Sequence, residues 1–214
     1  MSTPLQARVV PFMAFLLVGL LQTLPGETMR YWGYLAKTVF GAILLWRIWP
    51  LVPEARWKWS WEAVAAGVLV LVIWVGLEGW YPKLGKAGPA WNPFATYGEG
   101  SWAGGAFVVM RILGSSLVVP PMEEMFFRSF AYRYIVKVEF ASVSLGTLDL
   151  PAFLLTSVLF AVEHREWLPG LLCGFIYQAV VLRKGRLGDA MVAHAITNFL
   201  LGLWVVWKGA WQFW

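Results

Sequence analysis

Charged residues, histidine and cysteine are all scarce in this chain of 214 residues. Only 14% of the residues are charged and 59% are hydrophobic, whereas a soluble domain carries about 25% charged residues. The single cysteine, Cys173, excludes an intramolecular disulfide and a metal site built on thiolates, and we expect it to be a small core residue. The net charge of +5 lies beside apolar segments, which favours anionic lipid headgroups over nucleic acid as a partner.

Long apolar segments fill most of the chain and predict an all-α membrane protein. A spanning helix needs about 20 apolar residues, fewer where the bilayer thins, and an open sheet edge finds no partner in lipid. We therefore predict a polytopic helix bundle with about eight membrane segments around a polar cavity. These segments are Val9–Leu24, Tyr31–Trp49 (with Lys37 inside), Trp61–Trp80, Ser101–Val119 (with Arg111 near its middle), Met122–Val136, Leu150–Val162, Leu168–Leu182 and Leu187–Trp207.

Tryptophans and basic residues bear on how the chain lies in the membrane. Most of the fifteen tryptophans are near segment ends, as in an aromatic belt at the headgroups. With no repeat or second domain, residues 1–214 are expected to form one integral membrane domain, with the motifs in residues 102–207.

The number of crossings is a choice between two arguments. If Met122–Val136 does not cross, the basic residues gather on one side, in agreement with the positive-inside rule. If it crosses, that asymmetry disappears, but His164 then falls on the same side as Glu123. We predict eight segments, because a shared site demands proximity whereas the charge rule is only a bias.

Glu123, Glu124 and Arg128 lie in apolar surroundings, where a charge costs about 2.5–3.5 kcal/mol and suggests a functional site. Pro120 and Pro121 are expected to end one helix and place the glutamates in the first turn of the next, where the macrodipole stabilises anions. Glu124 and Arg128 are spaced for an i, i+4 ion pair, which leaves Glu123 available as a base. The alternative is that both glutamates are capping charges near an interface.

Two histidines complete the polar set. Phe160 and His164 share one helix face, and His194 and Asn198 share another, deep in apolar sequence. Less specific interpretations exist for each. His164 has charged neighbours and could pair with a helix C-terminus, while His194 and Asn198 could hold helices together in the membrane.

Together these side chains resemble the three motifs of the CAAX protease and bacteriocin-processing (abortive-infection) superfamily, which includes the Ras-converting CAAX endopeptidases: Glu123-Glu124-x-x-x-Arg128, Phe160-x-x-x-His164 and His194-x-x-x-Asn198. The tryptophan-rich first half and the stretch Glu163-His164-Arg165-Glu166-Trp167 also resemble the bacterial CAAX prenyl protease-related proteins associated with exosortase systems. Ser129 stands where many members have glycine, a departure expected to affect packing more than chemistry.

The resemblance implies an intramembrane endopeptidase without a cofactor, located in the bacterial inner (plasma) membrane and acting on a peptide or membrane-protein substrate. An exosortase-type sorting system is a further expected partner. The resemblance implies that Glu123 activates water with the help of His164. It also implies that His194 and Asn198 stabilise the oxyanion. The residues implied to support them are Glu124, Arg128 and Phe160.

Three other functions use the same residues. A zinc protease could take its ligands from Glu123, His164 and His194, although the chain has no HExxH motif and Asn198 has no part in that scheme. A non-catalytic scaffold would use the polar residues only to hold helices together. A transporter would use them as a proton relay. A protease needs all four residues around one water-filled pocket, which a scaffold does not.

Overall fold

The structure is a computed structural model that describes residues 3–21, 26–86 and 88–214. The all-α prediction is confirmed, since the described residues contain helices and no strand. The helices are α1 (Pro4–Leu21), α2 (Glu27–Ile48), α3 (Trp61–Gly76), α4 (Pro93–Tyr97), α5 (Trp102–Leu113), α6 (Val119–Glu124), α7 (Tyr132–Val136), α8 (Leu150–Val162), α9 (Trp167–Lys184) and α10 (Leu187–Lys208).

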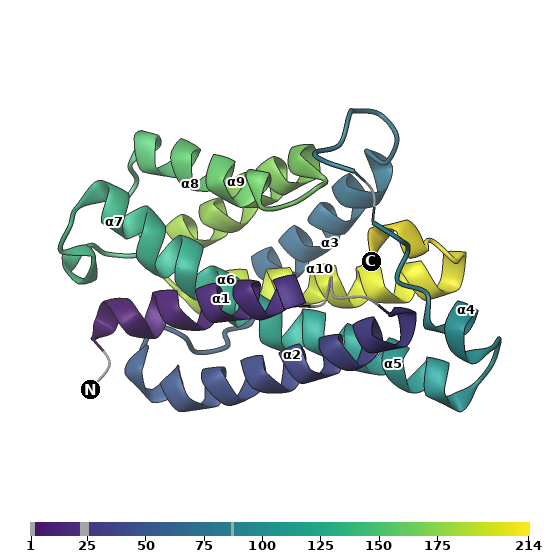
Figure 1. Ribbon diagram of the computed structural model, residues 1–214. Coiled ribbons are helices and arrows are strands. Elements are labelled where there is room, and N and C mark those ends of the chain that lie inside the picture. The colour runs from purple at the N-terminus through teal and green to yellow at the C-terminus, as the bar shows by residue number, and fades with distance from the viewer. Residues whose placement is uncertain (1–2, 22–25, 87) are drawn as a thin grey trace.

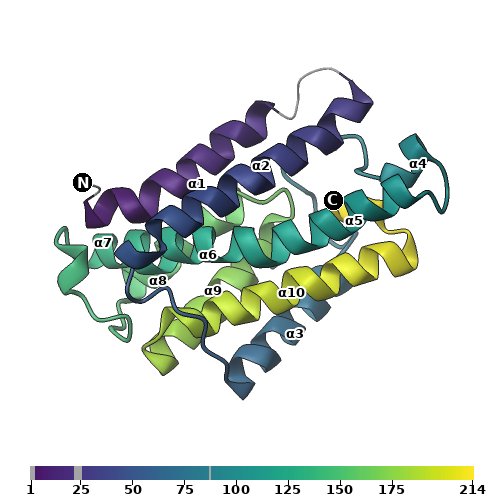
Figure 2. The ribbon, with the colours of Figure 1, turned by 90° about the horizontal axis from the view of Figure 1, so that it is seen from below.

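The long helices lie side by side along one direction. Figure 2 shows α1, α2, the run from α5 to α7, and α10 next to one another, and Figure 1 shows α8 and α9 beside them. α3 packs very closely on α10, because a Cβ placed on Gly67 would lie 2.6 Å from the Ala193 carbonyl oxygen. The Thr197 hydroxyl donates to the Gly67 carbonyl at 2.8 Å. Glycine at position 67 therefore lets α10 approach α3 closely, as small residues do between membrane helices.

The exterior of the bundle is apolar. Leu17, Leu20 and Val72 are among many large aliphatic side chains that stay exposed, and Trp61 and Trp102 are exposed at helix ends. Two helical runs are long and apolar enough to cross a membrane by length and composition, Trp102–Val136 and Leu187–Lys208. An apolar exterior of this extent favours contact with lipid.

One expected boundary is wrong: Pro120 and Pro121 do not separate two helices. Residues Trp102–Val136 form one helical run of 35 residues. Two π-helical segments, Gly114–Val118 and Met125–Ala131, flank α6 within it. A proline inside an α-helix clashes with the carbonyl four residues earlier, and the wider π turn before Pro120 relieves that crowding. The glutamates consequently lie in a helix interior and not in a first turn.

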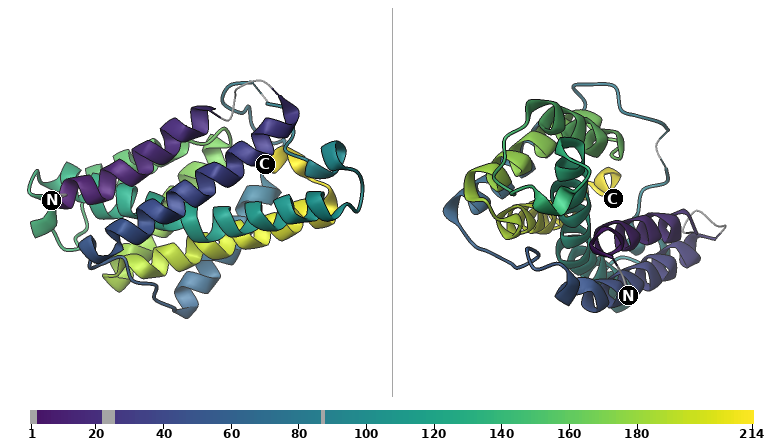
Figure 3. Two further views of the ribbon diagram at one scale, coloured as in Figure 1. Left: turned by 60° about the horizontal axis from the view of Figure 1, so that its bottom comes forward. Right: turned by 90° about the vertical axis from the view of Figure 1, so that its left-hand side faces the viewer.

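This continuous run also bears on the number of segments. The described residues supply seven long helical runs (α1, α2, α3, α5–α7, α8, α9 and α10), so the arrangement of eight segments is not confirmed. If seven runs cross the membrane in alternate directions, the basic residues gather on one side of it, in agreement with the positive-inside rule. Eight crossings would remove that asymmetry. The views in Figure 3 show successive long runs returning along the bundle.

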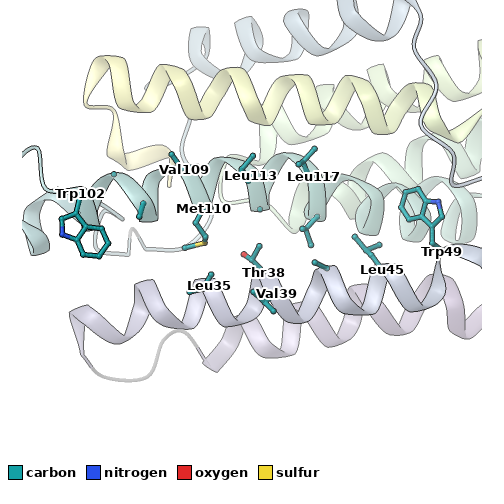
Figure 4. Close-up of a pocket in the computed structure, with 15 residues that line it drawn as sticks. Leu35, Thr38, Val39, Leu45, Trp49, Trp102, Val109, Met110, Leu113 and Leu117 are labelled. Atoms are coloured by element: carbon teal, nitrogen blue, oxygen red, sulfur yellow. The ribbon is translucent and has the colours of Figure 1, made fainter.

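A groove of about 930 Å³ runs between α2 and α5 on the outside of the bundle. Figure 4 shows Trp49 at one end and Trp102 at the other, with aliphatic side chains between them. Apart from the two indoles, Thr38 brings the single polar side chain to its lining. The groove therefore offers little for catalysis, and the polar residues converge elsewhere.

Candidate active site

A cavity of about 110 Å³ lies where α3, the α5–α7 run, α8, α9 and α10 meet. Its lining includes Glu123, His164, His194 and Asn198, which come from three separate segments of the sequence. A water molecule occupies about 30 Å³ in the liquid, so the space admits water beside these polar groups. The structure thus brings together the four residues to which the resemblance gives chemical roles.

The short helix α8 explains how His164, which lies in a turn, can line the cavity. α8 has 13 residues, which makes it about 20 Å long, whereas the hydrocarbon core is about 30 Å thick. The turn that follows α8 carries His164, whose Nδ1 lies 2.8 Å from the Phe160 carbonyl oxygen. Because a carbonyl can only accept, Nδ1 carries the proton and Nε2 of the neutral ring keeps a lone pair.

His194 lies between the two glutamates. Its Nδ1 is 3.0 Å from Glu124 Oε1, and its Nε2 is 3.9 Å from Glu123 Oε2. The contact with the Glu124 carboxylate fixes the orientation of the ring. A donor role for Nε2 toward an oxyanion requires the doubly protonated ring, because Nδ1 already donates to Glu124.

Glu124 and Arg128 form the i, i+4 ion pair that the spacing predicts. Arg128 Nε is 3.2 Å from Glu124 Oε2, and both side chains are buried. The Arg128 guanidinium carbon also lies 4.3 Å from the centre of the Phe160 ring. Although the contact with Glu124 is close enough for an ion pair, none of the guanidinium nitrogens makes a hydrogen bond within the described chain. Glu123 Oε2 makes none either. Buried polar atoms without protein partners are where water or a substrate carbonyl is expected.

Asn198 has a partner that the sequence does not reveal. Its Nδ2 donates to the Ser115 carbonyl oxygen at 2.8 Å. In an α-helix that carbonyl would receive the Val119 N–H, but in the π turn the Val119 N–H donates to Gly114 instead. Its π-type partner would be residue 120, which is proline and has no N–H. Pro120 therefore leaves the Ser115 carbonyl free to hold the Asn198 amide beside the cavity.

The cavity also has aromatic and hydroxyl side chains that the sequence did not single out, namely Trp74, Tyr177 and Thr197. The Tyr177 hydroxyl lies 2.6 Å from the Thr197 hydroxyl, and the Tyr177 ring lies 5.2 Å from the His194 ring. A tyrosine in the middle of an apolar segment was the available signal for Tyr177. Nothing in the sequence distinguishes Trp74 from the other tryptophans.

A buried network ties the motif helix to the amino-terminal half of the chain. The Ser129 hydroxyl donates to Glu54 Oε1 at 2.6 Å, and Arg8 and Arg133 both pair with the same oxygen, at 2.6 and 2.7 Å. Arg8 Nε also donates to the Ser129 hydroxyl at 2.8 Å. Ser129 was expected to matter through packing, but its contacts are polar.

This network predicts a loss of stability in acid. Burial opposes ionisation of Glu54, but hydrogen bonds from Ser129 and Arg8 outweigh it and hold its pKa below the usual 4.5. A lowered folded-state pKa stabilises the fold above about pH 4.5, and this contribution disappears as the pH falls through the folded-state value. We expect the difference in melting temperature between wild type and Glu54→Gln to be largest near neutral pH and to narrow in acid. A difference that is constant with pH would contradict the role given to the carboxylate.

Residues 105–200 match the family model for Rce1-like proteins, described as Type II CAAX prenyl endopeptidase Rce1-like. The resemblance to the CAAX protease superfamily is confirmed. The matched region is just under half of the chain and contains all three motifs. No curated protein and no solved structure matches the chain.

The CAAX protease match supports a membrane-embedded endopeptidase at the level of the family. It does not bear on the mechanism or on the role of any single residue. In the ranges that the structure describes, no three His, Cys, Asp or Glu side chains are grouped as a metal site. Cys173 is a free, buried thiol at the cavity wall, in agreement with its expected place in the core.

Proposed function

We propose that the chain is an intramembrane endopeptidase that hydrolyses a peptide bond of a peptide or membrane-protein substrate. The observation that carries this proposal is the polar cavity lined by Glu123, His164, His194 and Asn198. In the proposed scheme Glu123 removes a proton from water with help from His164 Nε2. His194 and Asn198 stabilise the oxyanion, and Glu124, Arg128 and Phe160 support them. No cofactor is required in this scheme.

The contacts of the supporting residues agree with such roles. The Phe160 ring lies 4.7 Å from the His164 ring and also under the Arg128 guanidinium, so it supports both groups. Glu124 holds both His194 and Arg128, which fixes two elements of the site at once. Donors and bases that are held in place before the reaction need no reorganisation when charge develops.

For the whole chain we propose a single membrane domain of seven helical crossings in the bacterial inner membrane. The amino terminus would be cytoplasmic, because the ends of the runs on that side carry most of the basic residues. An exosortase-type sorting system remains the proposed partner, on the resemblance of the tryptophan-rich first half and the sequence around His164.

The proposal is tested by mapping the peptide bonds that the protein cuts. Membrane-protein termini are compared by mass spectrometry in cells with wild type, with Glu123→Gln, and with Glu139→Gln. Glu139 is an exposed acid that pairs with Lys137, so the last variant is a matched control. New termini are expected with wild type and Glu139→Gln and absent with Glu123→Gln. Termini identical in all three would favour a scaffold or a transporter.

Asn198→Ala is expected to lower the rate of peptide hydrolysis by about 10²–10³-fold, with little change in substrate binding, since one oxyanion donor is lost. The same change leaves the Ser115 carbonyl unpaired, which costs about 1–3 kcal/mol of stability. The measurements are kcat and KM with a mapped substrate peptide, together with the melting temperature. A rate within a few-fold of wild type would remove Asn198 from the proposed chemistry.

Metal dependence separates this scheme from a zinc protease. In the metal-free scheme, exhaustive chelation of the detergent-purified protein leaves its activity unchanged. In the zinc scheme, activity follows removal and return of one tightly bound equivalent, and His194→Ala loses that metal. Metal analysis before and after chelation, with activity measured on the same samples, distinguishes the two.

A further inference from the structure

Trp74 differs from the tryptophans on either side of it in the sequence. Trp61 at the start of α3 and Trp80 just after this helix are 86% and 83% exposed, as in an aromatic belt at the headgroups. Trp74 is only partly exposed, packs against the buried core and lines the polar cavity. Its position therefore relates it to the cavity and not to the membrane surface.

The face of α3 that meets α10 brings Trp74 to the cavity. Gly67 allows the close approach of α10, and Trp74 follows Gly67 by two helical turns on the same face. On α10, Leu201 follows Thr197 by one turn, and the Thr197 hydroxyl donates to the Gly67 carbonyl. Trp74 and Leu201 both line the cavity, so each of the two packed helices contributes one apolar side chain to it.

The lining of the cavity divides into a buried floor and a partly exposed rim. The floor consists of the buried residues Glu123, Phe160, Cys173, Tyr177, His194 and Thr197. The rim consists of the partly exposed residues Trp74, Val119, His164, Asn198 and Leu201. A substrate chain therefore reaches the floor past the rim, where Trp74 has the largest side chain.

Trp74 lies against the part of the site that is proposed to activate water. Its ring and the His164 ring meet edge to face, with their centres 5.5 Å apart and an angle of 77° between their planes. In the proposed scheme His164 helps Glu123 to take a proton from water. The attacked carbonyl carbon must come within reach of that water, so the residue that supplies the carbonyl lies beside the Trp74 indole.

The cavity leaves little room for the side chain of that residue. Of about 110 Å³, one water of about 30 Å³ leaves about 80 Å³, whereas pockets for small molecules measure about 300–1,000 Å³. The Cα of the residue is bonded to the attacked carbon at about 1.5 Å, so its side chain has to share this space. The hydrogen bond of 2.6 Å between the Tyr177 and Thr197 hydroxyls ties α9 to α10 and holds the floor together. The space suits a hydrogen atom, a methyl group or a hydroxymethyl group, and excludes the side chains of leucine and phenylalanine.

We propose that the peptidase cleaves on the carboxyl side of glycine, alanine or serine, and that Trp74 excludes larger side chains from this position. The inference rests on the proposed peptidase function and names the class of peptide bond that it cleaves. One methylene group changes kcat/KM by about 10–200-fold in a closely fitting apolar pocket, whereas an added hydroxyl is rejected only weakly. The bulk of the indole at the rim is therefore enough to set the preference.

A peptide library tests the proposal without a known substrate. Peptides from a tryptic digest of a bacterial membrane proteome are incubated with detergent-purified wild type, Trp74→Ala or Glu123→Gln, and new termini are identified by mass spectrometry. After correction for the composition of the library, wild type should cut after the three small residues at least about 10-fold more often than after leucine and phenylalanine. Trp74→Ala should lower this ratio by about 10-fold, through new cuts after the large residues.

Two further variants control for effects on the fold. Trp80→Ala is the matched control, because it removes an exposed indole close to the end of the same helix, and it should leave the ratio unchanged. Trp74→Phe keeps a ring beside His164, so it preserves the packing and should lower the ratio by less than Trp74→Ala. The melting temperature of each sample separates a change of preference from a loss of fold.

The outcomes separate failure of this inference from failure of the peptidase function. Cuts by wild type without regard to size overturn the inference alone, as does a wild-type ratio in the folded Trp74 variants. Loss of all cuts by both folded Trp74 variants also overturns it, because a residue that only limits size is not needed for cleavage after glycine. If wild type makes no cuts beyond those in the Glu123→Gln sample, the peptidase function is overturned and the inference with it.

Discussion

Glu123→Gln is expected to lower peptide hydrolysis by about 10²–10⁴-fold, the usual contribution of a general base. Glutamine keeps the shape of the side chain but cannot accept a proton from water. Glu123 accepts no hydrogen bond at Oε2 from the described residues, and His194 Nε2 is 3.9 Å from that oxygen. Because no strong contact is lost, the variant should remain folded and inserted.

The measurement is kcat on a mapped substrate peptide, with the melting temperature of the same purified sample. Glu139→Gln changes an exposed acid that follows α7 in the sequence, and it should leave both values unchanged. Turnover close to wild type by folded Glu123→Gln would remove the general-base role, whatever the fate of the other residues.

Breaking the Glu124–Arg128 pair is expected to destabilise the protein by about 3–5 kcal/mol, since either single change leaves an uncompensated buried charge. Glu124→Ala should cost the most, because Glu124 also holds His194 Nδ1 at 3.0 Å. Activity should fall together with stability in both single variants.

A double-mutant cycle with Glu124→Ala, Arg128→Met and the double variant measures the coupling. The double variant should lose less than the sum of the single losses, because it buries no unpaired charge. Arg47→Met, a change of a more exposed cation near the end of α2, is the control. Strict additivity would mean that the 3.2 Å contact of Glu124 and Arg128 contributes no interaction energy.

The parts of the fold that the sequence predicts well are those set by a single local pattern. The expected segment Leu150–Val162 coincides with α8, because Asp149 caps an apolar run that charged residues end. The expected start of the last segment, Leu187, is also the start of α10. Likewise the Glu124–Arg128 contact follows from helical spacing alone.

The parts that were missed depend on contacts between distant segments. Two adjacent prolines favour a break locally, and the π turn that accommodates them is stabilised by packing of the whole helix. The Ser115 carbonyl and the Asn198 amide are far apart in sequence, so no spacing links them. Trp91 lies between two predicted segments, where the sequence gives no sign of burial, yet it is buried against Tyr31 and Tyr34.

The short α8 has a consequence for the bilayer itself. Its outer face, which includes Leu154, Leu155 and Leu159, is exposed, and its length is only about two thirds of the thickness of a typical hydrocarbon core. Such a negative hydrophobic mismatch thins the surrounding lipid. For the proposed peptidase, such thinning would bring the water boundary toward the turn that carries His164 and give the hydrolytic water a short path from bulk. We therefore expect turnover to depend on membrane thickness, with shorter acyl chains giving the higher rate.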